Sequence, residues 1–358
     1  MSFFWSSWIT IFSLTCWFFI FGVLMWTLKN KPALDEDGTT GHVYDGVREY
    51  DKPLPKWWLW VFFGTLAWSV LYFALYPSLQ PGSWKGMATV TVNGQEQPWT
   101  SEGELAQDLE RNHNVFIENF NGILDGAGAG EAKPILAKLE GLQAQKGSDN
   151  APADLQTQID EQVKALAPYV DKLAQDPAAY MVGQRLFLQN CALCHGSNAE
   201  GAVGYPNLTD NDWLYGGEAE NILLSIHNGR VGGMAAWQQQ LGEDGVRATA
   251  EYVLSIASGY GVGVDNGALD QALVAQGKPI FDANCVLCHG ADAKGLTAMG
   301  APNLTDDIWL FGGDRAAVQQ TIRHGRSGVM PAWQTRLGNE RVALLAAYVK
   351  ALSQQPAQ

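Results

Sequence analysis

The chain has 358 residues, of which 47% are hydrophobic and 17% are charged, and its formal net charge is −14. Soluble domains carry about 25% charged residues, so the low charged fraction indicates that part of the chain lies in lipid. An acidic chain lacks the basic face that nucleic-acid binding requires, and five unevenly spread cysteines exclude a disulfide scaffold. The length allows two or three structural units.

Two long uncharged segments lie within residues 1–80, which we expect to form a membrane anchor. They run from about 5 to 28 and from about 57 to 79, and about 20 apolar residues are enough to cross a bilayer. Aromatic residues lie near the ends of both segments, as expected at a membrane interface. A cleaved signal peptide is the alternative for the first segment, but that segment lacks a basic beginning and a small-residue cleavage site.

The basic residues predict the orientation of this anchor. Five of them lie in the connecting loop 29–56, whereas residues 1–28 carry none and only Lys85 follows the second span closely. Under the positive-inside rule, the connecting loop is cytoplasmic. We therefore expect the anchor in a bacterial inner membrane, with the rest of the chain in the periplasm.

Residues 81–176 are expected to form a mostly helical periplasmic spacer. An alternating stretch around Asn93-Gly94 predicts a short hairpin. The polar segments 102–124 and 131–175 are predicted to be helical, with breaks at GAGAG and KGSDNAPAD. The spacer contains no recognisable chemistry, and we expect it to pack against a partner or against the domain that follows.

The C-terminal half contains two copies of one pattern. GQRLFLQNCALCH begins at Gly183 and GKPIFDANCVLCH at Gly277, and three further segments of the first copy recur in the second. This pattern predicts two tandem domains, 177–262 and 268–356, joined by a glycine-rich hinge. Helical spacing of apolar residues at both ends of each copy predicts that its first and last helices cross.

Each copy contains Cys-x-x-Cys-His, the attachment signal of c-type haem. The two thiols add to the two vinyl groups of haem, and the adjacent histidine approaches the iron. A four-cysteine zinc site does not require the histidines, and a thioredoxin-type site does not explain two copies without a preceding strand. The sequence therefore predicts two covalently bound haem c groups. Their cysteines are Cys191, Cys194, Cys285 and Cys288.

Histidine and methionine are the predicted axial ligands of both irons. His195 and His289 directly follow the cysteines, while Met234 and Met330 lie at matching positions in glycine-flanked loops about 40 residues further on. Two such ligands fill all six iron positions, which suits electron transfer. The alternative is that the two methionines are ordinary core residues.

Four other residues bear on these sites. His227 and His324 are competing ligands, but they do not align with each other in the repeat, so bis-histidine coordination is the weaker alternative. Pro206 and Pro302 are positioned either to present a backbone carbonyl to the ligating histidine or simply to begin turns.

The segment TTGHVYDGVREYDKPLPKWW, residues 39–58, leads directly into the second span. It resembles the signature of the CcoP/FixP subunit of cbb3-type cytochrome c oxidases, and DWLYGG at 212–217 and the two haem domains extend the likeness over nearly the whole chain. The resemblance implies a mainly α chain. Two transmembrane helices, a helical spacer and two tandem class I cytochrome c domains would follow one another.

The resemblance also implies a function and a set of partners. Such a subunit takes electrons from a periplasmic donor cytochrome c and passes them through a monohaem subunit to the catalytic haem–copper subunit, which reduces oxygen. By position, it pairs His195 with Met234 and His289 with Met330, and it assigns no catalytic residue to this chain. Membrane lipid is the remaining expected partner. The alternatives are a stand-alone membrane-anchored dihaem carrier and a dihaem peroxidase, which would need an open iron position.

Overall fold

The computed structural model describes residues 3–30, 36, 38–50, 55–77, 85–148, 151–258 and 268–354. The chain divides into two compact units, Met1–Phe116 and Ile117–Gln358. The glycine-rich hinge expected between the two C-terminal copies, at 259–267, lies outside the described residues.

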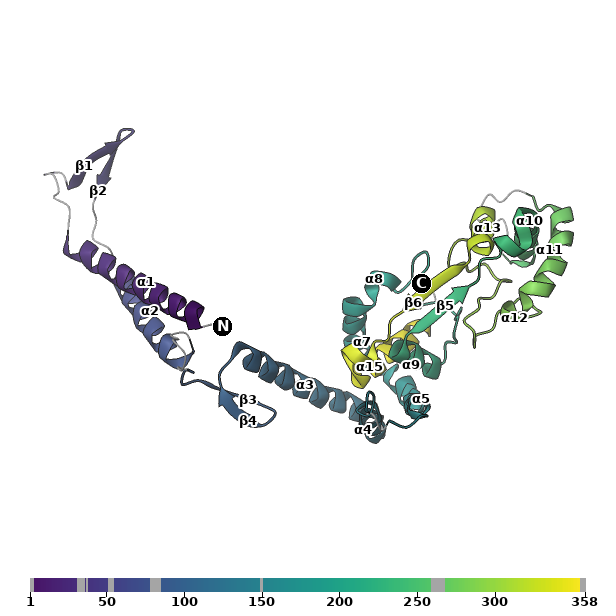
Figure 1. Cartoon of the computed structure of the whole chain (residues 1–358), viewed down its shortest axis with the longest axis horizontal. Coiled ribbons are helices and arrows are strands. Elements are labelled where there is room, and N and C mark those ends of the chain that lie inside the picture. The colour runs from purple at the N-terminus through teal and green to yellow at the C-terminus, as the bar shows by residue number, and fades with distance from the viewer. Residues whose placement is uncertain are drawn as a thin grey trace. The chain divides into compact units, whose positions relative to one another are not determined.

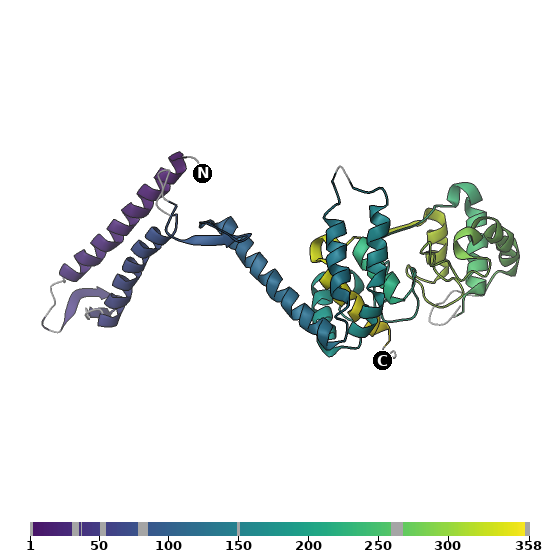
Figure 2. The same cartoon turned by 90° about the horizontal axis from the view of Figure 1, so that it is seen from below.

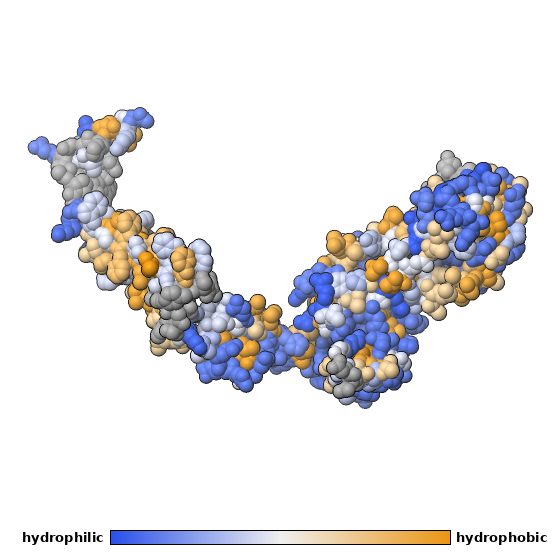
Figure 3. Space-filling model, in the orientation of Figure 1, coloured by the Kyte–Doolittle hydropathy of each residue, from blue (hydrophilic) through white to orange (hydrophobic). Residues whose placement is uncertain are grey.

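Two long apolar helices dominate the first unit. α1 (Phe3–Lys29) and α2 (Lys56–Leu75) lie in the two segments predicted to span the membrane, and each is long and apolar enough to cross one, although α2 ends earlier than the predicted bound at 79. Their outward side chains are mostly apolar, as the orange surface of these helices in Figure 3 shows, and Trp60 is 77% exposed. The indole N–H of Trp17 donates to Ser69 Oγ at 3.0 Å and links the two helices.

The loop between these helices contains an antiparallel hairpin of β1 (Thr39–Tyr44) and β2 (Val47–Tyr50). Its turn residues, Asp45 and Gly46, both have positive φ. Asp-Gly is a strong sequence signal for a two-residue hairpin turn, so this hairpin could have been predicted from the sequence, although it was not.

A second hairpin follows α2, formed by β3 (Thr89–Val92) and β4 (Gln95–Pro98). Asn93 and Gly94 form its turn, both with positive φ, which confirms the predicted hairpin. This turn type requires the left-handed conformation at both positions, and asparagine and glycine tolerate it best.

The spacer is mostly helical, as predicted. α3 (Ser101–Gly126) includes the division between the two units, and three shorter helices follow it: α4 (Ala132–Gln143), α5 (Leu155–Ala165) and α6 (Ala167–Leu173). Each shorter helix buries one apolar stripe while its other faces remain polar. The three helices pack against α9 (Ala219–Asn228) and α15 (Asn339–Ser353) of the second unit.

The two repeats form the same elements in the same order, with one exception. The first repeat contains α7 (Pro177–Asn190), α8 (Ala192–His195), α9 (Ala219–Asn228), β5 (Arg230–Met234) and α10 (Gln238–Ile256). The second repeat contains α11 (Gln271–Asn284), α12 (Val286–His289), α13 (Arg315–His324), β6 (Arg326–Met330), α14 (Gln334–Leu337) and α15 (Asn339–Ser353). The exception is that α10 of the first repeat, which is kinked at Gly242, corresponds to both α14 and α15 of the second. Asp176 and Asp270 cap the first helix of each repeat by accepting backbone N–H bonds.

The helices cross between the repeats, and not within each repeat as expected. α7 packs on α15 of the second repeat, and α10 packs on α11. Gly183 lies so close to α15 that a Cβ there would come within 2.6 Å of Leu344 O and Tyr348 Cβ. Gly277 is pressed in the same way against the backbone of Ala248. Each repeat therefore packs its last helix on the first helix of the other.

β5 and β6 form the connection that makes this exchange possible. They pair antiparallel over their whole length, with Arg230 opposite Met330 and Met234 opposite Arg326, and they run between two groups of helices (Figures 1 and 2). We call these groups the His195 lobe (α7, α8, α9, α14 and α15) and the His289 lobe (α10 to α13). Both methionines end strands instead of lying in loops, because the two segments satisfy their backbone hydrogen bonds with each other.

Candidate haem-binding sites

Each Cys-x-x-Cys-His segment forms one helical turn at the end of a longer helix. Cys191 ends α7, and α8 carries Cys194 and His195. The backbone N–H of His195 donates to Cys191 O at 3.0 Å, which holds the three side chains on one turn. The second repeat has the same arrangement, and all four cysteines of the two segments are free thiols.

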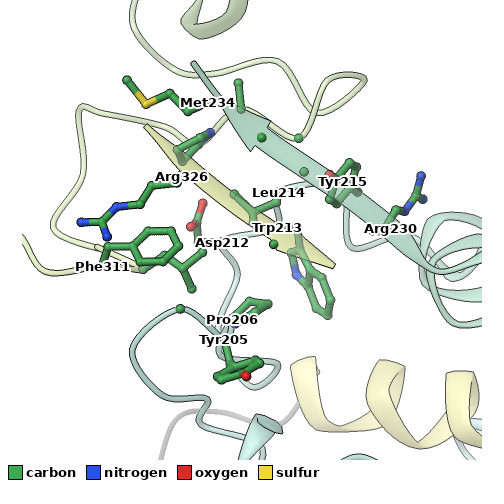
Figure 4. Close-up of a pocket in the computed structure, with 18 of the residues that line it drawn as sticks. Tyr205, Pro206, Asp212, Trp213, Leu214, Tyr215, Arg230, Met234, Phe311 and Arg326 are labelled. Carbon is green, nitrogen blue, oxygen red and sulfur yellow. The ribbon is translucent and has the colours of Figure 1, made fainter. Parts of the chain in front are cut away.

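Both segments line one cavity of about 800 Å³ within the second unit, part of which is shown in Figure 4. The lining includes all four thiols, both histidines, both methionines and the indoles of Trp213 and Trp309. Thr249 Oγ1 is buried in this wall with no hydrogen-bond partner among the described residues. Burial and the neighbouring thiol raise the pKa of Cys191 to about 11, so the thiol is neutral. This donor set fits haem c.

A backbone carbonyl orients each of the two histidine rings. His195 Nδ1 lies 3.0 Å from Pro206 O, and His289 Nδ1 lies 3.1 Å from Pro302 O. A carbonyl only accepts, so Nδ1 carries the hydrogen and Nε2 keeps the lone pair that an iron ligand needs. Burial lowers the pKa of both histidines, which favours this neutral form. The two prolines therefore present their carbonyls to the histidines, the first of the two roles considered for them.

The two methionines lie in the lobes opposite to those expected. Met234 packs against the same buried cluster as Cys285, in the His289 lobe. Met330 lies where the chain enters the His195 lobe, and three residues later the N–H of Trp333 donates to Ile226 O at 3.0 Å. The structure thus brings Met234 to the lobe of His289 and Met330 to the lobe of His195. This differs from the pairing that the resemblance implies.

His227 belongs to a polar network. Its Nε2 accepts from Gln143 Nε2 at 3.0 Å, and its Nδ1 lies 2.7 Å from Asn228 Oδ1. Gln143 and Asn339 also exchange two hydrogen bonds of 2.9 Å. Both ring nitrogens of His227 are therefore engaged away from the haem site. The network also attaches the spacer to the His195 lobe, one of the two positions expected for the spacer.

Three carboxylates were not anticipated from the sequence. Asp212 lines the cavity, and burial followed by the charges of Asp306 and Asp210 raises its pKa to about 6. Asp210 and Asp306 occupy the same position of the repeated PNLTD segment, which is the signal that could have revealed them. Among the residues that the structure describes, no group of three or more histidine, cysteine or acidic side chains could hold a metal ion.

Two known domain families match this chain. Residues 36–83 match the N-terminal domain of cytochrome oxidase-cbb3, FixP, and residues 178–253 and 272–349 both match cytochrome c oxidase, cbb3-type, subunit III. The second unit therefore contains two cytochrome c domains, a class whose prosthetic group is haem c.

Curated relatives extend this match over most of the chain. The sequence is 36% identical to the cbb3-type cytochrome c oxidase subunit CcoP of Rubrivivax gelatinosus, over 98% of this chain and 95% of that protein. It is 35% identical to CcoP of Cereibacter sphaeroides, over 90% and 97%, and 34% identical to FixP of Bradyrhizobium diazoefficiens, over 88% and 94%. The chain belongs to the CcoP/FixP family of cbb3-type cytochrome c oxidase subunits. Its apolar N-terminal helices anchor it in a membrane.

Proposed function

We propose that this chain is the dihaem electron-transfer subunit of a cbb3-type oxidase. A periplasmic donor cytochrome c supplies the electrons, which pass through the two haems of this chain and a monohaem subunit to the catalytic haem–copper subunit. The observation that carries the proposal is the pair of Cys-x-x-Cys-His turns, each with an oriented neutral histidine, on one cavity of two cytochrome c domains.

Each residue of the two sites has a defined role. One cysteine pair would hold each haem covalently, and His195 or His289 together with Met234 or Met330 would bind its iron. Bound haem supplies a one-electron change between ferrous and ferric iron. The Pro206 and Pro302 carbonyls hold the histidine rings in place and increase their basicity. An iron bound by both a histidine and a methionine would have no position left for a substrate, so the chain would relay electrons without a catalytic residue of its own.

We further propose that both haem domains lie in the periplasm and that the β1–β2 hairpin lies in the cytoplasm, in a bacterial inner membrane. Basic residues are concentrated in the loop that contains this hairpin, which supports this orientation. A phosphatase reporter that is active only outside the cytoplasm should be active when fused at Lys85 and inactive when inserted at Asp45-Gly46. The reverse pattern would overturn the orientation.

Capture of the complex through a tag on this chain tests the function. We expect the captured material to contain haem c, haem b and copper and to consume oxygen in a cyanide-sensitive reaction. Pyridine haemochrome spectra and an oxygen electrode measure these properties. Material with two haems c per chain, no haem b and no oxygen uptake would show a stand-alone carrier. A tagged chain without Cys191, Cys194, Cys285 and Cys288 is the control for haem carried by other proteins.

A further inference from the structure

Two arginines occupy equivalent positions of the two repeats and line the cavity of the candidate haem sites. Arg230 begins β5 and Arg326 begins β6, and each ends one of the matching segments IHNGR and IRHGR. The same cavity is lined by the four thiols and the two histidines of the Cys-x-x-Cys-His turns. Among the described residues of that lining, the two arginines are the only arginines or lysines. The positive charge of the cavity wall is therefore concentrated at two related points.

Neighbouring side chains hold the guanidinium of Arg230 in place. Its Nε donates to Ser225 Oγ at 2.9 Å, and the guanidinium lies over the ring of Tyr215, 4.4 Å from the ring centroid. Figure 4 shows this arginine beside the Tyr215 ring. The ring also packs on Gly300 of the second repeat, where a Cβ would overlap it. Nη2 makes only a long contact of 3.5 Å with Asn221 O, so the outer edge of the guanidinium keeps donors for a further partner.

Arg326 has the same surroundings in the second repeat. Its Nε donates to Thr321 Oγ1 at 2.9 Å, and its guanidinium lies over Phe311, 4.4 Å from the ring centroid. This ring packs on the first repeat, because a Cβ at Gly204 would lie 3.2 Å from it. The Nη groups of Arg326 donate no hydrogen bond to any residue that the structure describes. A hydroxyl and an aromatic ring thus fix both arginines and leave their outer donors available.

Neither of these two arginines forms an ion pair with a described residue. By contrast, Arg323 lies outside the cavity lining and pairs with Glu243 at 2.8 Å. Burial lowers the pKa of Arg230, yet a guanidinium remains protonated at physiological pH. Charges that are removed from water usually have a partner of opposite sign. The two positions therefore favour an anionic group inside the cavity.

A carboxylate is the anion that best fits these donors. A guanidinium presents parallel N–H groups that bind both oxygens of one carboxylate. Haem c carries two propionate carboxylates, on the edge of the ring opposite the vinyl groups to which cysteines add. The cofactor proposed for this cavity therefore supplies the negative charge that the arginines lack.

We infer that Arg230 and Arg326 bind haem propionates, one arginine for each haem. Arg230 is bonded to α9 and serves the haem of the His195 lobe, whereas Arg326 is bonded to α13 and serves the haem of the His289 lobe. The inference rests on the proposed function, in which each site holds haem c. A fixed positive charge near a haem favours ferrous over ferric iron, so both arginines raise the reduction potentials.

Redox titration of the full-length chain in detergent tests this role. Arg230→Gln should lower the potential of one haem and Arg326→Gln that of the other, so the double variant should lower both. Arg323→Gln removes a guanidinium of the same segment outside the cavity, and this matched control should leave both potentials unchanged. A chain with alanine at both Cys285 and Cys288 keeps only the haem of the His195 lobe. In that chain Arg230→Gln should lower the single potential, and Arg326→Gln should not.

The pH dependence of the potential separates propionate binding from a distant effect of charge. Without Arg230 the pKa of the propionate rises and reduction draws a proton, so the potential should fall more steeply with pH between about pH 5 and 8 than in the native chain. Asp160 and Tyr215 are the titratable groups that face Arg230, and Asp212, with a pKa of about 6, lies in the cavity wall. All three are present in both chains, so the difference in slope reports the propionate. A lower potential with an unchanged slope would overturn the inference.

The conservative variant separates charge from packing. Arg230→Lys keeps the charge and should restore most of the potential, and a potential as low as that of Arg230→Gln would show that lost packing is the cause and overturn the inference. If Arg230→Gln retains no haem, Arg326→Gln provides the same measurement in the other lobe. Unchanged potentials in both glutamine variants, with two haems attached, would refute the inference and leave the proposed function standing. A native chain without haem c would instead refute the proposed function.

Discussion

The two lobes of the second unit have the same elements but are held together by different chemistry. The His289 lobe joins its two repeats through ion pairs, one of them with a buried carboxylate, Glu251. The His195 lobe has an ion pair between Lys350 and the exposed Glu218, but its buried contacts are neutral hydrogen bonds around Gln143, and three spacer helices cover it. The residues that make these contacts differ between the two repeats. They therefore favour the arrangement in which the last helix of each repeat packs on the first helix of the other.

The positions that the repeats share make the common fold instead. Gly183 and Gly277 allow close helix crossings, and each crossing also has an aromatic pair: Phe187 with Tyr348 at 5.4 Å, and Phe281 with Tyr252 at 5.3 Å. Because both repeats have these residues, the same contacts would also form if each repeat closed on itself. They stabilise each helix crossing, but they do not determine whether its two helices come from the same repeat or from different repeats.

The largest expected effect is the loss of one haem from one lobe. Cys285→Ala combined with Cys288→Ala removes both attachment points of the second haem, so haem c per chain should fall from two to one. The Cys191→Ala and Cys194→Ala pair is the matched variant for the other lobe. Pyridine haemochrome spectra of the purified chain measure the stoichiometry, and two haems in either double variant would contradict the assignment.

Removal of the buried carboxylate should be the next largest effect. Glu251→Ala removes the carboxylate that pairs with Arg315, and breaking a buried pair costs about 3 kcal/mol. We expect a lower thermal unfolding midpoint for the detergent-solubilised chain. Asp244→Ala, whose side chain is almost fully exposed, is the control on the same helix and should change the midpoint little. Equal effects of the two variants would show that this ion pair does not hold the two repeats together in the His289 lobe.

The neutral network of the His195 lobe should contribute less. Gln143→Ala removes the hydrogen bonds to His227 and Asn339 and should cost about 1–2 kcal/mol of unfolding free energy. The same unfolding measurement applies, with the exposed Gln145→Ala as control. If Gln143→Ala destabilises the chain as much as Glu251→Ala does, the contrast between the two lobes is wrong.

The smallest expected effect concerns pH. The pKa of Asp212 is raised to about 6 from an ordinary value of 3.8, so the folded chain binds this proton more tightly than the unfolded chain. Stability should therefore fall between about pH 4 and 6 and level off above. Asp212→Asn should remove about 1 kcal/mol of this fall, less than the full shift implies because the group is half-exposed. An unchanged pH profile of unfolding in the variant would contradict this effect.

Local sequence patterns were enough to predict most helices and strands and the residues of the candidate haem sites. Both membrane helices, the Asn93-Gly94 hairpin and the mostly helical spacer depend on composition and short-range geometry, and the structure has all of them. The sequence position of Pro206 also allows its carbonyl to meet His195, and the structure has this contact.

Tertiary structure alone decided which repeat completes which site. Two copies of one pattern satisfy the same local rules whether each closes on itself or exchanges with the other, so periodicity and spacing cannot distinguish the two arrangements. The choice depends on contacts between residues far apart in the sequence, above all Glu251 with Arg315 and Gln143 with Asn339. A buried charge or amide is stable only opposite its complement, and only the folded chain shows which residues meet.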